Sequence, residues 1–393
     1  MFLDYVSLFW VIVAVLVSGI LLGRVWSYFA AREEGVYSKR MVRGSSSYVL
    51  GMNYLISNQP DLAIMELERA AKQDPDAVEV HIVLGNLYRE KGQVERAIQI
   101  HNGTLQRRAL SRAERNLARF CLGLDYKSAG FVDKAVEIFE ELVEADRADE
   151  RAFAILVKLY EEVGQLDKAY RLQQELTRMR RSDDRSLMAF LEVQMGKKLL
   201  DRGELEGSER RFKRAIDLEP ATYPAYLYYG DLHMKRGEPF EAVGMWERMV
   251  RINYKRAHLA FERLDGAYRE LGHEGKIEEL LREVMENQPY DWRSRTYLAE
   301  IYARRGEHDR GFELFNEAIR LNPHSLAIHQ KIWKLLGGAK LDKAKVDDYI
   351  KLTEEIIFFL DPFVCIDCGY KTTEFLWKCP HCHSWDSFSE IRM

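Results

Sequence analysis

The sequence predicts an all-α protein in three parts: an amino-terminal transmembrane helix, a superhelical solenoid of paired helices, and a small four-cysteine domain at the carboxyl end. Three observations lead to this fold class. An uncharged apolar run opens the chain, a motif of about 34 residues recurs through its middle, and two Cys-x-x-Cys pairs close it. With 47% apolar residues and only nine prolines, the middle of the chain has the composition of one continuous helical core.

The apolar run extends from Tyr5 to Gly23 and contains nineteen residues without a charge. A helix of this length spans about 28 Å, close to the roughly 30 Å hydrocarbon core of a bilayer. The alternative is a cleaved signal peptide, but Asp4 stands where a basic region is expected and the apolar run is longer than such peptides need. We therefore assign residues 1–25 to an uncleaved anchor and residues 26–43 to a juxtamembrane linker.

The charges that flank the run predict its orientation. Only Asp4 and the amino terminus precede it, whereas five basic residues follow it closely: Arg24, Arg32, Lys39, Arg40 and Arg43. The positive-inside rule then places the bulk of this single-pass chain on the cytoplasmic side. Thiols are kept reduced there, which favours metal binding over disulfide formation.

The middle of the chain repeats with the tetratricopeptide period of about 34 residues. The third repeat shows the pattern well, with Leu122-Gly123, Tyr126, Gly130, Ala135 and Phe139 at the expected spacing. Small residues let two antiparallel helices approach closely, and a glycine ends the first helix of each pair in a tight turn. Neighbouring pairs are expected to stack into a right-handed superhelix. The array covers residues 44–325, with eight repeats that begin near residues 44, 78, 116, 150, 189, 223, 258 and 292.

Residues 326–360 read as two further helices without the repeat pattern. We interpret them as a capping pair at the end of the array. The second helix ends in the apolar run Ile356–Leu360, which we expect the cysteine domain to cover.

Two cysteine pairs, Cys365–Cys368 and Cys379–Cys382, stand ten residues apart in the terminal segment 361–393, called the metal domain below. Two such turns can place four thiolates tetrahedrally around one structural ion, Zn or Fe. The closed set leaves no position for substrate or water. Disulfides or unused thiols are the alternative, which a reducing compartment disfavours.

Composition and motifs argue against two classes of function. The net charge is −4 and the terminal segment is acidic, so we expect no nucleic acid partner. The sequence also lacks a Gly-rich phosphate loop, a GxSxG turn and an HExxH helix. We therefore expect no enzyme activity. Whether the array forms a homo-oligomer is left open.

Positions on the first helix of each repeat are expected to line a concave face, as in other tetratricopeptide arrays. A row of cations there would attract an acidic or carboxylate-terminated peptide. The alternative is that these charges only solvate an exposed helix face, because Glu90, Glu161, Glu162 and Asp201 lie alongside. The candidate partner-binding residues are Asn86, Arg89, Lys127, Lys158 and Lys197, with Arg269 further along.

The order of the three parts, ending in the run FVCIDCGYKTTEFLWKCPHCHSW, resembles the lipopolysaccharide assembly protein B family over essentially the whole chain. The most specific residues are Cys365, Cys368, Gly369, Trp377, Cys379, Pro380, Cys382 and Trp385. The resemblance implies a rubredoxin-like metal domain, of the zinc-ribbon kind, that packs on the repeats. It also implies that Cys365, Cys368, Cys379 and Cys382 are the metal ligands.

The same resemblance implies a function. Such proteins are adaptors at the cytoplasmic face of the inner membrane, where they promote degradation of the lipid A deacetylase LpxC by the protease FtsH and act with other lipopolysaccharide assembly proteins. Two alternatives remain open: a membrane-anchored scaffold or chaperone for envelope assembly, and a rubredoxin-like electron carrier. True rubredoxins separate their cysteine pairs much further, so the spacing here favours zinc or adventitious iron.

Overall fold

The computed structural model describes residues 46–338, 343–353 and 363–390. These residues fall into two compact units, Met1–Val163 (unit 1) and Gly164–Met393 (unit 2). The predicted anchor, the linker and the apolar run Ile356–Leu360 lie outside the described residues. Within the described ranges, none of the helices combines the length and the apolar character needed to cross a bilayer.

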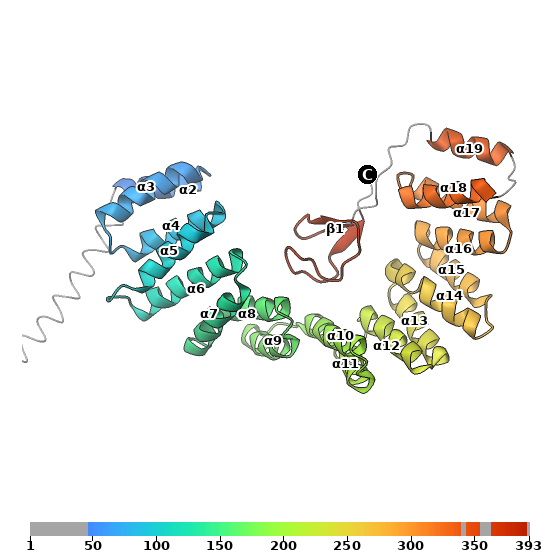
Figure 1. The fold of residues 1–393 in the computed structure, drawn as a ribbon, viewed down its shortest axis with the longest axis horizontal. Helices are drawn as coiled ribbons and strands as arrows, with labels where there is room; N and C mark the ends of the chain where they lie inside the picture. The colour runs from blue at the N-terminus through green and yellow to red at the C-terminus, as the bar shows by residue number, and fades with distance from the viewer. Residues whose placement is uncertain (1–45, 339–342, 354–362, 391–393) are drawn as a thin grey trace, which may run out of the picture. The chain divides into compact units, whose positions relative to one another are not determined.

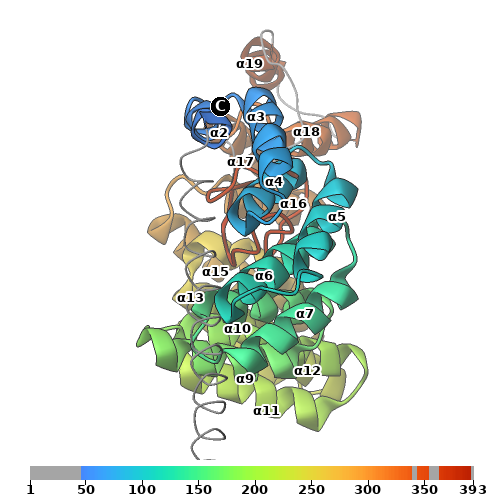
Figure 2. The same cartoon turned by 90° about the vertical axis from the view of Figure 1, so that its left-hand side faces the viewer.

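Unit 1 consists of antiparallel helix pairs, and its consecutive helices lie side by side (Figures 1 and 2). Its described helices are α2 (Ser46–Ile56), α3 (Pro60–Gln73), α4 (Val78–Glu90), α5 (Val94–Leu105), α6 (Arg112–Ser128), α7 (Val132–Ala145) and α8 (Glu150–Glu162).

Unit 2 continues the same pattern and then adds the metal domain. Its described helices are α9 (Leu166–Arg180), α10 (Arg185–Asp201), α11 (Leu205–Leu218), α12 (Tyr223–Arg236), α13 (Pro239–Ile252), the 3-10 helix η1 (Tyr254–Leu259), α14 (Phe261–Glu270), α15 (Lys276–Asn287), α16 (Trp292–Arg304), α17 (His308–Leu321), α18 (Leu326–Gly338) and α19 (Lys343–Thr353). The tetratricopeptide architecture predicted from the period is confirmed.

The tight turns predicted inside the helix pairs have a left-handed backbone, which glycine adopts without steric cost. Their φ angles lie between 72° and 82°. In the first pair, Asn58 takes this place with φ 53°. The turn glycines are Gly92, Gly130, Gly164, Gly203, Gly237, Gly272 and Gly306.

Close approach of the paired helices depends on small residues at fixed positions. Ala97 on α5 is completely buried. A Cβ added to Gly85 on α4 would lie only 2.6 Å from His101 Cε1 on α5. The same contact recurs in unit 2, where a Cβ on Gly230 would lie 2.6 Å from Trp246 Cδ1. Large rings on the second helix therefore pack directly against the backbone of the first.

Two first helices are longer than the consensus and absorb the extra residues between repeats. Each of α6 and α10 has 17 residues and starts four residues ahead of the repeat start expected from sequence. At the start of α6, Ser111 and Glu114 form a capping box, which fixes where that helix begins.

The metal domain contains a three-stranded antiparallel sheet in the order β2-β1-β3. Its strands are β1 (Phe363–Cys365), β2 (Lys371–Thr372) and β3 (Phe388–Glu390). Cys365 pairs with Phe388 across β1 and β3, and both side chains are buried. The sheet thus fixes the first cysteine of the metal domain.

Candidate metal centre

The two cysteine pairs sit in matching turns. In the first, the Gly369 N–H donates to the carbonyl of Cys365 over 2.9 Å, and Gly369 has φ 76°. In the second, the His383 N–H donates to the carbonyl of Cys379 over the same distance. Each turn closes a short loop that aims its two sulfurs toward the other pair.

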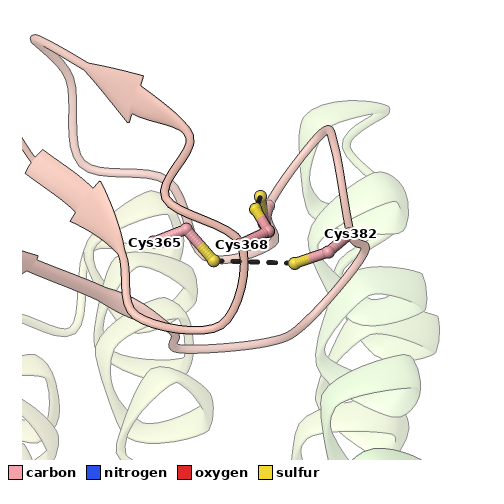
Figure 3. A group of neighbouring side chains, drawn as sticks. Cys365, Cys368 and Cys382 are labelled. Atoms are coloured by element: carbon pink, nitrogen blue, oxygen red, sulfur yellow. Dashed lines mark hydrogen bonds between the residues drawn. The ribbon is translucent and has the colours of Figure 1, made fainter. Parts of the chain in front are cut away.

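The four sulfurs form a compact group, all within 4.8 Å of one another. Cys365 Sγ and Cys382 Sγ face each other at 3.5 Å (Figure 3). Cys368 Sγ lies 3.6 Å from Cys379 Sγ. Four sulfurs bound tetrahedrally at about 2.3 Å from a zinc ion stand about 3.8 Å apart. The donor set and its spacing therefore fit one metal ion.

Hydrogen bonds at the centre favour thiolates at two of the cysteines. Burial opposes ionisation of Cys365, but hydrogen bonds from Ser387 Oγ and from the Asp367 and Cys368 N–H groups outweigh it and lower the pKa of this thiol to about 6. The Ser384 hydroxyl likewise lowers the pKa of Cys382. Thiolates are the form that binds metal. A bound ion would hold the two turns together, and the four sulfurs leave it no open position for chemistry.

Within unit 2, the metal domain packs on the repeat helices through aromatic rings. The Trp385 ring lies parallel to that of Phe190 on α10, with centroids 5.2 Å apart. The Trp377 ring lies 5.3 Å from that of Tyr223 on α12. Trp377 Nε1 also donates to the Tyr228 hydroxyl over 2.9 Å. These contacts hold both tryptophans of the cysteine motif against the repeats.

Polar contacts complete this attachment. The Tyr223 hydroxyl donates to the Asp386 carboxylate over 2.6 Å. Arg256 on η1 donates to Asp386 over 3.2 Å and to the Phe388 carbonyl over 2.7 Å. Burial, followed by the charge of Asp386, raises the pKa of Tyr223. We call Phe190, Tyr223, Tyr228 and Arg256 together the docking face.

Comparisons with known proteins agree with this arrangement. A family described as a rubredoxin metal binding domain matches residues 363–390, and tetratricopeptide repeat families match residues 54–119, 193–257 and 277–325. Lipopolysaccharide assembly protein B of Escherichia coli (strain K12) is 27% identical over 355 residues, which cover 89% of this chain and 90% of that protein. The protein of the same name from Haemophilus influenzae is 24% identical over 360 residues, covering 88% and 90%. The resemblance to the lipopolysaccharide assembly protein B family is confirmed.

The candidate partner-binding residues lie in both units of this relative of lipopolysaccharide assembly protein B, and their contacts differ. In unit 1, Arg89 forms an ion pair of 2.8 Å with the completely buried Asp125, and only 16% of the Arg89 side chain is exposed. Asp125 also bonds the buried His101 at 2.5 Å. Arg89 thus connects α4 to α6.

The other candidates have varied surroundings. Asn86 on α4 and Lys127 on α6 are half-buried, and Lys158 on α8 is exposed. In unit 2, Lys197 lies 5.3 Å above the Tyr228 ring, beside the docking face. Arg269 pairs with Asp265 one turn away on α14. A partner-binding role for these side chains stays a prediction.

Sequence reasoning did not identify the docking face. The sequence does contain a signal, because α12 carries four tyrosines within seven residues, more than the one or two aromatic positions that the repeat motif uses. Tyr226 packs in the core, while Tyr223 and Tyr228 contact the metal domain.

Proposed function

We propose that the chain is a non-enzymatic inner-membrane adaptor that regulates lipopolysaccharide synthesis by promoting FtsH-dependent proteolysis of LpxC. Similarity to lipopolysaccharide assembly protein B over about nine-tenths of both chains supports this proposal. Tetratricopeptide repeats support it as well, since such arrays bind peptide segments of other proteins. The metal ion has a structural task in this proposal.

One observation carries the proposal furthest: the metal domain is attached to the repeats by both rings and charges. The attachment joins residues more than 100 positions apart, such as Tyr223 and Asp386, into one surface. A protein partner would therefore meet repeats and metal domain together. This arrangement suits recognition and has no need of a reacting group.

We further propose that the apolar run Tyr5–Gly23 anchors the chain in the inner membrane with its bulk in the cytoplasm. A tether of this kind raises the local concentration of the repeats toward the millimolar range near other membrane proteins. Weak contacts would then be enough to bring LpxC to a membrane protease.

Zinc is the ion that we propose for the four cysteines. Four thiolates with closed coordination are typical of structural zinc. Elemental analysis of the purified chain, together with a redox titration, separates this proposal from an electron carrier. A reversible one-electron iron signal would favour the carrier.

The adaptor proposal is tested by the half-life of LpxC after depletion of this protein. We expect a longer half-life, restored by the wild-type chain but not by a Cys365→Ser variant or by a chain that lacks residues 1–25. An unchanged half-life together with an envelope defect would instead favour a scaffold or chaperone.

A further inference from the structure

Beside the docking face, unit 2 contains a cleft of about 790 Å³ with two walls. One wall comes from the repeats: Lys255 and Arg256 on η1, Tyr290 before α16, and Arg293 on α16. The other wall comes from the metal domain, where Ile366 and Ser387 contribute. The cleft therefore exists only while the metal domain rests on the repeats.

The charges of the cleft are unbalanced. Its two carboxylates are already used within the fold, because Asp386 accepts from Tyr223 and Arg256, and Asp291 accepts from the Ser294 N–H over 2.9 Å to cap α16. Lys255 is exposed and has no carboxylate partner among the described residues. The cleft thus presents a cation to a visiting ligand.

The neighbouring His258 is consistent with a positive potential here. Burial lowers the pKa of His258 well below its ordinary value, and the charges of Arg293 and Arg256 lower it further. Both arginines line the cleft, whereas His258 lines a neighbouring pocket that shares Arg293 with it. Such a field favours a negatively charged ligand.

Both walls also offer apolar surface to solvent. Tyr290 on the repeat wall and Ile366 on the metal-domain wall are each 71% exposed. Exposed large apolar side chains next to a cation suit a peptide that carries both carboxylates and an apolar anchor. A phosphate group alone would leave both apolar side chains uncovered.

We propose that this cleft binds an acidic peptide segment of a partner protein, with a carboxylate at Lys255 and an apolar side chain between Tyr290 and Ile366. The inference rests on the proposed adaptor function and names the chemistry of its partner. It also couples recognition to the metal, because Ile366 lies between the ligand Cys365 and Asp367 in the first cysteine turn. Losing the ion would remove one wall of the cleft.

The test begins with the full-length, metal-loaded chain in detergent micelles and a phage-displayed library of random dodecapeptides. We expect the enriched peptides to be acidic with at least one large apolar residue. A labelled synthetic copy of the most enriched peptide then serves as the probe in fluorescence anisotropy. Lys255→Glu should weaken its binding about tenfold and Lys255→Arg should not, because a charge-assisted contact is reversed in one and kept in the other.

Two further variants distinguish binding in the cleft from non-specific binding to exposed apolar side chains. Ile366→Ser should weaken binding of the probe several-fold without changing the metal content or the melting temperature. Phe240→Ser is the matched control, since Phe240 on α13 is 70% exposed but does not line the cleft. It should bind like the wild type. Removing the metal with a chelator should abolish binding.

Several results would overturn the proposal: no enrichment, enrichment of neutral or basic peptides, equal binding by Lys255→Glu, or displacement of the probe by phosphatidylglycerol vesicles. The last would show a lipid site. Probe binding does not depend on LpxC, so it can succeed where the half-life experiment fails, and the two proposals are separable.

Discussion

The Asp386 carboxylate in the metal domain accepts a hydrogen bond from the Tyr223 hydroxyl at the start of α12, with 2.6 Å between the oxygens. Asp386 follows the second cysteine pair by four residues and has a left-handed backbone, with φ 46°. Asp386 lies outside the segment between the first and last cysteine, but its N–H donates to the carbonyl of Trp377 inside that segment over 2.7 Å, so the turn that presents the carboxylate is held to the loop between the cysteine pairs. Metal binding and docking on the repeats are linked through it.

Tyr223→Phe should loosen the metal domain without unfolding the repeats. Asp386 keeps Arg256 as a partner, so we expect a loss of about 1–2 kcal/mol in the free energy of docking. Urea titration followed by tryptophan fluorescence measures it, because Trp377 and Trp385 lie in the interface.

Tyr160→Phe is the matched control, because Tyr160 makes a similar bond of 2.5 Å to Glu140 but lies in unit 1. Tyr160→Phe should lower the free energy of unfolding of unit 1 without a change in the environment of Trp377 and Trp385 at low urea. An identical tryptophan response in both variants would contradict the docking role of Tyr223.

Removal of the metal, by chelation or by Cys365→Ser, should release the metal domain from the repeat helices of unit 2. Structural zinc sites of this kind contribute roughly 10–16 kcal/mol of apparent binding free energy. We expect tryptophan emission to shift to the red and the terminal segment to become sensitive to trypsin, while helical circular dichroism is largely kept. A metal-free chain that still resists trypsin at Lys371 and Lys378 would show that the ion is dispensable for docking.

Gly230→Ala should destabilise unit 2 strongly. The new methyl group would overlap the Trp246 indole, which is buried and donates to the Leu227 carbonyl over 3.0 Å. We expect a cost of about 1–3 kcal/mol from forced repacking. Gly244→Ala on α13 is the control, because nothing lies within 4 Å of its added Cβ and alanine favours a helix by up to about 1 kcal/mol. Equal melting temperatures for the two variants would contradict the close helix packing.

Acidification should lower the free energy of unfolding of unit 2 because His258 is buried in its neutral form. Burial lowers the pKa of this ring well below 6.5 in the folded state, whereas the unfolded chain takes up a proton near 6.5. Its contribution to stability is therefore complete above pH 6.5 and declines as the pH falls below it, by at most about 1.4 kcal/mol per pH unit. His258→Gln should flatten this dependence in urea titrations between pH 7.5 and 5.5.

Metal content must be measured at each pH in that experiment, because protonation of the thiolates also releases metal. The prediction is contradicted if the wild type and His258→Gln lose the same free energy of unfolding on acidification while both keep their metal. Protonation of His258 would then not be the cause of the loss.

The sequence predicts the regular parts of this fold well, since they depend on local rules. The turn glycine Gly130 and the buried Ala97 follow from the spacing of small residues alone. The sulfur cluster follows from two short turns, each of which is a local structure. The repeat period therefore predicts the helix pairs, and the cysteine motif predicts the grouping of the four sulfurs.

The docking of the metal domain could not be predicted in the same way. We expected this domain to cover Ile356–Leu360, which lie outside the described residues, whereas its described contacts are with α10, α12 and η1. Contacts such as that of Arg256 with Phe388 join residues 132 positions apart. Such contacts produce no repeating pattern in the sequence from which they could be predicted. The 3-10 helix that carries Arg256 also replaces part of the expected start of the seventh repeat near residue 258.

Native mass spectrometry of the full-length chain examines the link between metal and docking in a single experiment. We expect the folded chain to carry one metal ion, and collisional or chelator-driven loss of that ion to coincide with opening of the metal domain, seen as a more extended charge-state distribution. A chain that carries no metal and yet stays compact, with Trp377 still shielded from solvent, would contradict the link between metal binding and docking.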